Sequence, residues 1–152
     1  MDQIANYGDE RQSAFCAYCG GPTETRDHVP SRVLLDEPYP DNLPVVPACE
    51  SCNSSFSKDE EYLACLVECV LRGVVGAEGI QRTKIRRILE AKPALRAMLE
   101  EARSAANGQV VFDVQHDRVR NVVLKLARGH TAFELNEPQI DEPSCLQWCR
   151  CI

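Results

Sequence analysis

Two cysteine pairs constrain the fold of this chain more than any other feature of its sequence. They are "CAYC" and "CESC", and 29 residues separate them. Two residues between cysteines let the chain turn so that both sulfurs reach one ion, and four thiolates complete the tetrahedral shell of Zn²⁺. The spacing therefore predicts a structural zinc ion, closed to chemistry, bound by Cys16, Cys19, Cys49 and Cys52. The alternatives are four buried thiols or a redox pair.

The rest of the chain predicts an α+β fold. Six prolines between residues 15 and 52 exclude long helices there, so "TETRDHV" and "LPVVPA" are expected as short strands. A metal compensates for the small apolar core of such a segment. Helices are expected from near Asn53, over 81–91, from Pro93 and beyond residue 118, with a turn at Asn107–Gly108 and a strand in "QVVFDVQ". The apolar stripe of the first helix is expected to be Leu63, Leu66, Val67, Val70 and Leu71.

We therefore expect a zinc-stapled core over residues 1–72 and a mostly helical extension over 73–152, packed as one unit. No run of 18 apolar residues occurs and the first ten residues do not resemble a signal peptide, which predicts a cytoplasmic protein without membrane contact. The net charge is −6, but it is uneven: residues 1–60 carry −7 and residues 80–130 carry +6. The basic block is either a phosphate-facing surface, with Arg82, Lys84, Arg86 and Arg87 as candidates, or a solvated helix face.

The segment between the cysteine pairs carries a recognisable motif. "RDHVPSR" lies at residues 26–32, and "DNLPVVPACESCN" leads through the second pair to Asn53. CxxC, Asp-His-Val-Pro, Asn-Leu and CxxC-Asn, in this order, closely resemble the HNH endonucleases of the ββα-metal class, over about a third of the chain. The resemblance implies two antiparallel strands and a helix, in a treble-clef-like core, that grip one divalent cation.

The resemblance also implies residue roles. His28 matches the general base, Asn42 the central Asn that orients it, and Asp27 the acidic metal ligand. Asn53 stands where most members have the final His, which gives an H-N-N variant, and Phe56 stands where the family often has Lys. The implied activity is metal-dependent hydrolysis of DNA phosphodiester bonds, with 5′-phosphate and 3′-hydroxyl ends.

The chemistry of these side chains agrees with those roles. Asp and Asn oxygens suit Mg²⁺ or Mn²⁺, or another divalent cation such as Ni²⁺, whereas thiolates suit zinc, so two metals can coexist. An imidazole with a pKa near 6.5 accepts a proton at neutral pH. Glu60 lies on the helical face of Asn53 and is a further candidate ligand, or simply an exposed carboxylate. Arg26 and Arg32 are candidates for binding the scissile strand, or ordinary surface arginines.

Several alternatives stay open. His28 can be a structural imidazole and Asn53 a helix N-cap, in which case the chain is a non-catalytic zinc-binding module that contacts nucleic acid or protein. The remaining five cysteines can be buried thiols, a redox switch or a second zinc site: Cys65, Cys69, Cys145, Cys149 and Cys151. A homodimer, or a role as a partner subunit of a defence system, also stays open.

Overall fold

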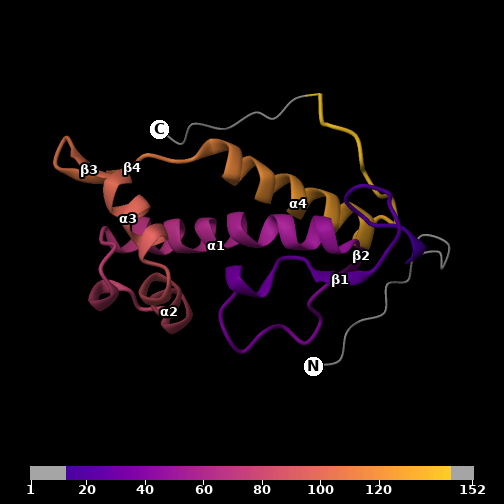
Figure 1. The fold of residues 1–152 in the computed structure, drawn as a ribbon, viewed down its shortest axis with the longest axis horizontal. Helices are drawn as coiled ribbons and strands as arrows, with labels where there is room; N and C mark the ends of the chain where they lie inside the picture. Colours follow the sequence, from indigo (N-terminus) through magenta and orange to yellow (C-terminus); the bar gives the residue numbers. More distant parts are fainter. Residues whose placement is uncertain (1–12, 145–152) are drawn as a thin grey trace.

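The structure, a computed structural model, describes residues 13–144 and has the expected α+β composition (Figure 1). Strands β1 (Thr25–His28) and β2 (Val45–Ala48) form an antiparallel hairpin, in which Asp27 is opposite Val46 and His28 is opposite Val45. A 23-residue helix, α1 (Glu50–Arg72), follows β2 directly. The strand, strand and helix thus follow one another in the predicted order.

Helix α1 begins three residues earlier than expected because Cys49 is its N-cap. The Cys49 Sγ atom accepts a hydrogen bond from the backbone N–H of Cys52 at 3.3 Å, so the second cysteine pair also starts the helix. The interpretation of Asn53 as the N-cap is therefore wrong. At its other end the helix stops at Gly73, whose φ of 68° is the left-handed conformation that glycine adopts without strain.

The predicted apolar stripe of α1 is wrong in most of its positions. Leu66 is buried, but Val67, Val70 and Leu71 are 46%, 51% and 70% exposed. The buried face is centred instead on Tyr62, Cys65, Leu66 and Cys69, and it also includes Glu60 and Glu68. Helix α2 (Thr83–Ala91), helix α4 (His116–Glu134) and a short 3-10 helix at Arg32–Leu34 pack on this face, so the positions of these elements decide which side of α1 is covered.

Two short helices, a β-hairpin and a long helix follow α1. Helices α2 (Thr83–Ala91) and α3 (Pro93–Ala102) are followed by a hairpin of β3 (Arg103–Ala106) and β4 (Gln109–Phe112), and then by α4 (His116–Glu134). Pro93 occupies the first turn of α3 as predicted. Asn107 and Gly108 have φ values of 53° and 77°, as tight hairpin turns require. The strand β3 was not expected, since "RSAA" lacks strand-forming residues.

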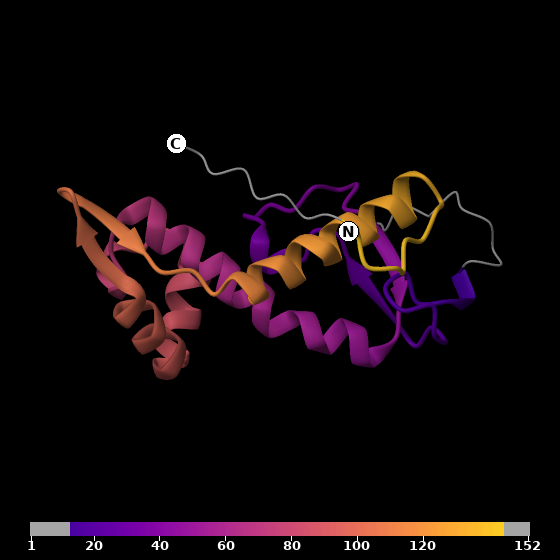
Figure 2. The same cartoon turned by 90° about the horizontal axis from the view of Figure 1, so that it is seen from above.

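Helix α4 returns along α1 and covers the β1–β2 hairpin, whereas β3–β4 lies at the opposite end of the molecule (Figures 1 and 2). Two clusters of buried side chains result. One surrounds the middle of α1, and the other joins Tyr18, Val29, Val46, Phe56 and Ala132 near the cysteine pairs. The last helix of the extension thus packs on the predicted core. Within the described residues, none of the helices has the length and apolar character needed to span a membrane.

Candidate functional site

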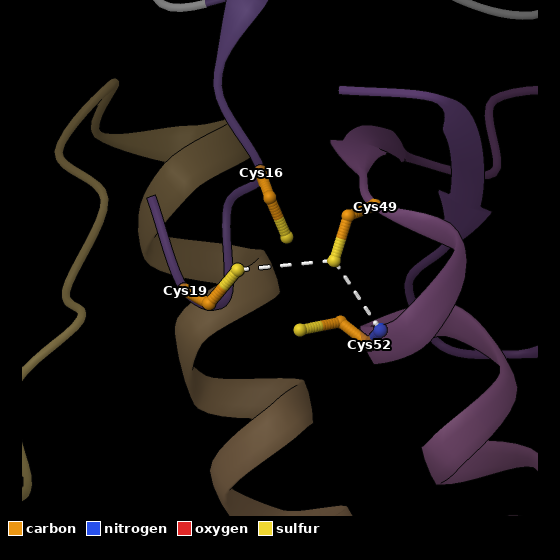
Figure 3. Close-up of side chains that lie close together, drawn as sticks. All are labelled: Cys16, Cys19, Cys49 and Cys52. Carbon is orange, nitrogen blue, oxygen red and sulfur yellow. Dashed lines mark hydrogen bonds between the residues drawn. The ribbon is translucent and has the colours of Figure 1, made fainter. Parts of the chain in front are cut away.

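The four predicted zinc ligands converge at the start of the β1–β2 hairpin (Figure 3). Their sulfur atoms all lie within 4.8 Å of one another, and the Sγ atoms of Cys19 and Cys49 are 3.8 Å apart. A tetrahedron with Zn–S bonds of about 2.3 Å has edges of about 3.8 Å, so the spacing fits a four-sulfur zinc shell. Over residues 13–144 this is the one group of three or more His, Cys, Asp or Glu side chains whose ligand atoms could hold an ion.

Backbone N–H groups point at these sulfurs, as thiolate ligands require. Gly21 donates to Cys19 Sγ at 3.4 Å, and Tyr18 donates to Cys16 Sγ at 3.5 Å. The N–H of Cys52, which donates to Cys49 Sγ, is the main cause of a lowered pKa of the Cys49 thiol. The backbone hydrogen bond thus stabilises the charged, zinc-binding form of Cys49, whereas burial raises the pKa of the Cys52 thiol.

The remaining described cysteines do not join this cluster. Cys65 and Cys69 are fully buried in the core around α1, and burial raises their pKa values to about 12 and about 11. They are thus packing residues rather than reactive thiols. The prediction of a second metal site also depended on Cys145, Cys149 and Cys151, which lie outside the described residues.

Strand β1 directs His28 and Asp27 to opposite faces, because successive side chains of a strand alternate. His28 is half-buried, and its Nε2 atom lies 3.2 Å from Nη2 of Arg32. Burial, and then the positive charge of Arg32, lower the pKa of His28 below 6.5. The imidazole is therefore neutral near pH 7, with Nε2 as the hydrogen-bond acceptor of the guanidinium group. Arg26 is exposed on the same face of the strand.

The Asp27 side chain lies on the buried face of β1 and is 6% exposed. Its Oδ2 atom accepts a hydrogen bond from the hydroxyl group of Tyr18 at 2.8 Å and lies 2.8 Å from the Nζ atom of Lys125. The same ammonium group contacts the carboxylate of Glu60. The prediction of Glu60 as an exposed carboxylate is wrong: it is 4% exposed, and burial raises its pKa.

Lys125 is the residue that the sequence interpretation missed. It was counted with the basic block, yet it is 1% exposed on α4. It shares the buried face of α4 with Val122, Gly129 and Ala132, three, four and seven positions away. A lysine at the helical spacing of these buried residues is therefore the sequence signal that could have found it.

Asn53 braces β1 against the first turns of α1. Its Nδ2 atom lies 3.1 Å from Oγ1 of Thr25 and 3.4 Å from the carbonyl oxygen of Arg26. Thr25 and Asp27 share one face of β1, so Asn53 approaches the strand from the same side as the Asp27 carboxylate. One amide group therefore helps to fix the strand that carries both Asp27 and His28.

Asn42 stands apart from these side chains. It is exposed in the turn before β2 and lines a shallow cavity of about 460 Å³, together with His130 and Glu134 of α4. Within residues 13–144 no hydrogen bond connects Asn42 with His28. Its expected role in orienting the base stays a prediction.

The basic block is largely engaged inside the molecule. Five of its eleven Lys and Arg side chains contact acidic groups or a carbonyl of the first 61 residues, which carry the opposite charge. These contacts are Arg82 with Asp36, Lys92 with Glu61, Arg118 with Asp59, Lys125 with Asp27 and Glu60, and Lys84 with the carbonyl of Arg32. The uneven charge of the sequence thus reflects attraction between the two halves of the chain, and not only a surface for phosphate.

Models of known families, curated protein sequences and solved structures were all compared with this chain, and none of them matches it. What the chain does has to be argued from its own side chains.

Proposed function

We propose that this protein is an HNH-type endonuclease, a metal-dependent hydrolase of DNA phosphodiester bonds. The observation that supports this proposal best is the environment of His28. The imidazole lies at the end of a strand fixed by Asn53 and flanked by both cysteine pairs, its pKa is lowered, and Arg26 and Arg32 lie beside it. A neutral, anchored imidazole beside guanidinium groups is suited to activate water next to a phosphate.

In the proposed reaction, Arg32 turns from the His28 ring to a phosphate oxygen, which frees Nε2. Nε2 then takes a proton from water as the oxygen of that water attacks phosphorus. The bond from phosphorus to the 3′ oxygen breaks, and the leaving oxygen takes up a proton from solvent, which gives 5′-phosphate and 3′-hydroxyl ends. Arg26 and Arg32 bind the phosphate oxygens. A zinc ion held by the four cysteines would have no open position and would serve only to hold the two CxxC turns together.

The residues that would hold a catalytic Mg²⁺, Mn²⁺ or Ni²⁺ ion are Asp27 and Asn53. Both contacts of the Asp27 carboxylate described above fall on Oδ2, and Asn53 uses Nδ2 to bind β1. Oδ1 of each side chain is thus the oxygen that suits a hard cation. Such an ion supplies charge stabilisation for the phosphate and the leaving oxygen. His28 and Asp27 lie on opposite faces of β1. The phosphate therefore has to lie across the end of the strand to contact both the His28 imidazole and a cation at Asp27 and Asn53.

The second candidate function is a non-catalytic zinc-binding module that contacts nucleic acid or another protein. The burial of Asp27 favours it, since the carboxylate already has an internal ion-pair partner in Lys125. In that case Asp27 serves the packing of α4, and His28 is an ordinary half-buried imidazole.

A plasmid-nicking assay separates the two functions. Zinc-loaded protein is incubated with supercoiled DNA across a series of Mg²⁺, Mn²⁺ and Ni²⁺ concentrations, beside His28→Ala and the matched control His116→Ala. His116 is exposed at the first position of α4. We expect metal-dependent nicking by the wild type and the control, and a loss of about 10²-fold or more for His28→Ala.

Two results contradict the proposal. Nicking by His28→Ala at the wild-type rate refutes the assignment of the base. The absence of nicking by wild-type protein with every metal, for plasmid and single-stranded substrates alike, favours the non-catalytic module. Zinc content and thermal unfolding of each variant show that a loss of activity is not a loss of the fold.

A further inference from the structure

An ammonium group lies between the carboxylate of Asp27, a proposed metal ligand, and the carboxylate of Glu60. Lys125 Nζ is 2.8 Å from Oδ2 of Asp27 and also contacts Glu60, and the Lys125 side chain has 0% exposure. The ring of Phe56 lies 5.7 Å from the same nitrogen, and Tyr18 donates to the same oxygen of Asp27. The lysine therefore comes from α4 to complete a pocket built by β1 and α1.

The charges in this pocket do not balance. In their charged forms, the two carboxylates and the one ammonium group carry a formal charge of −1. Without Lys125 the pocket would present two carboxylates whose oxygens lack the ammonium partner. Carboxylate oxygens are the ligands that Mg²⁺, Mn²⁺ and Ca²⁺ prefer. Lys125 thus stands where the carboxylates would otherwise attract a divalent cation.

We propose that Lys125 is a positioning residue that weakens the binding of a divalent cation by Asp27. This inference rests on the proposed function only in treating Asp27 as a metal ligand. The ammonium group and the Tyr18 hydroxyl fill Oδ2, so an ion can use Oδ1 alone and is repelled by the nearby positive charge. The pocket therefore takes a metal weakly in the free protein, and a substrate phosphate has to supply the missing ligands.

The direct test is Mn²⁺ binding, measured from the EPR signal of free Mn²⁺ with zinc-loaded, full-length protein. Lys125→Met keeps the length of the side chain and removes its charge. We expect it to bind Mn²⁺ at least about ten-fold more tightly than the wild type, because the repulsion and the competitor for Oδ2 are both lost. Addition of Asp27→Asn to Lys125→Met should abolish this gain.

The matched control is Arg118→Met. Arg118 also joins α4 to α1, through Asp59 at 2.6 Å, but its pair is partly exposed and does not contact Asp27. A general loosening of α4 would change Mn²⁺ binding in both variants, whereas the proposed role changes it only in Lys125→Met. Equal Mn²⁺ affinity of Lys125→Met and wild type, or an equal gain in Arg118→Met, overturns the inference.

Lys125→Met leaves two unpaired buried carboxylates, which can prevent folding. The same substitution is therefore also tested in Glu60→Gln protein. In Glu60→Gln protein the same lysine substitution leaves one buried carboxylate instead of two. Lys125→Met should still tighten Mn²⁺ binding there by several-fold relative to Glu60→Gln alone, and an unchanged affinity refutes the proposal.

The outcome is independent of nuclease activity. If Lys125→Met gains Mn²⁺ affinity and neither protein nicks DNA, the role of Lys125 stands and the hydrolytic proposal fails. If the wild type nicks DNA and the affinities are equal, the hydrolytic proposal stands and the role of Lys125 fails. In an active protein, Lys125→Met should also lower the Mn²⁺ concentration that gives half-maximal nicking, a change that partial unfolding does not produce.

Discussion

Loss of the link that a zinc ion at the four cysteines would make is the perturbation whose size can be worked out most directly. Cys19 is an exposed ligand, so Cys19→Ser removes a metal bond without removing packed volume. The link between Cys19 and Cys49 closes a loop of 30 residues. The chain-entropy relation for a cross-link of that length gives about 3.6 kcal/mol at 25 °C for complete loss of the ion, because Cys16 keeps the loop closed for as long as the ion is bound. Since domains of this size are stabilised by only about 5–15 kcal/mol, the loss is a large part of the total.

We expect Cys19→Ser to lose zinc to a competing chelator far more readily than the wild type and to unfold at lower temperature or denaturant. The zinc content is measured by a colorimetric chelator, the free energy of unfolding by urea titration, and local opening by hydrogen exchange. Protection should fall first in β1 and β2, because the cysteine pairs flank these strands.

Cys69→Ala is the control for this experiment. Cys69 is fully buried in the other cluster, so its loss costs packing but leaves the four zinc ligands intact. It should keep the wild-type zinc content and the wild-type protection of β1. The reasoning is refuted if Cys19→Ser retains its zinc and stability in the chelator, or if Cys69→Ala loses zinc to the same extent.

Two further predictions concern the neighbourhood of His28. The NMR titration of its ring protons should have a midpoint below 6.5, and Arg32→Gln should raise that midpoint, because burial and then the Arg32 charge lower the pKa. As pH falls, the unfolded chain binds a proton at this histidine at a higher pH than the folded chain does, so the free energy of unfolding should decrease as pH falls through 6.5. The decrease should be smaller in Arg32→Gln. Identical titration midpoints in the two proteins would refute the role of Arg32. Gly129→Ala should destabilise by about 1–3 kcal/mol despite a gain of about 1 kcal/mol in helix propensity, because an added Cβ would lie 2.6 Å from Val29 Cγ2. Urea unfolding of Gly129→Ala with and without Val29→Ala tests this, and a stabilised single variant contradicts it.

The sequence by itself determined the features that depend on neighbours along the chain. The two CxxC spacings predicted the sulfur cluster because each pair folds as a local turn, although they are 29 residues apart. Proline placed the start of α3, and Asn107–Gly108 placed a tight turn, since both restrict backbone dihedral angles locally.

Only the tertiary structure decided which charges meet. Lys125 and Glu60 are 65 positions apart. The spacing along α4 places Lys125 on the buried face of that helix, but it does not specify that this face meets Glu60 of α1. The same packing buried Glu60, left Val70 and Leu71 exposed, and paired the basic block with the acidic first half of the chain. The physical reason is that burial and electrostatic attraction act between surfaces brought together in space, whereas sequence patterns record only contacts within one element.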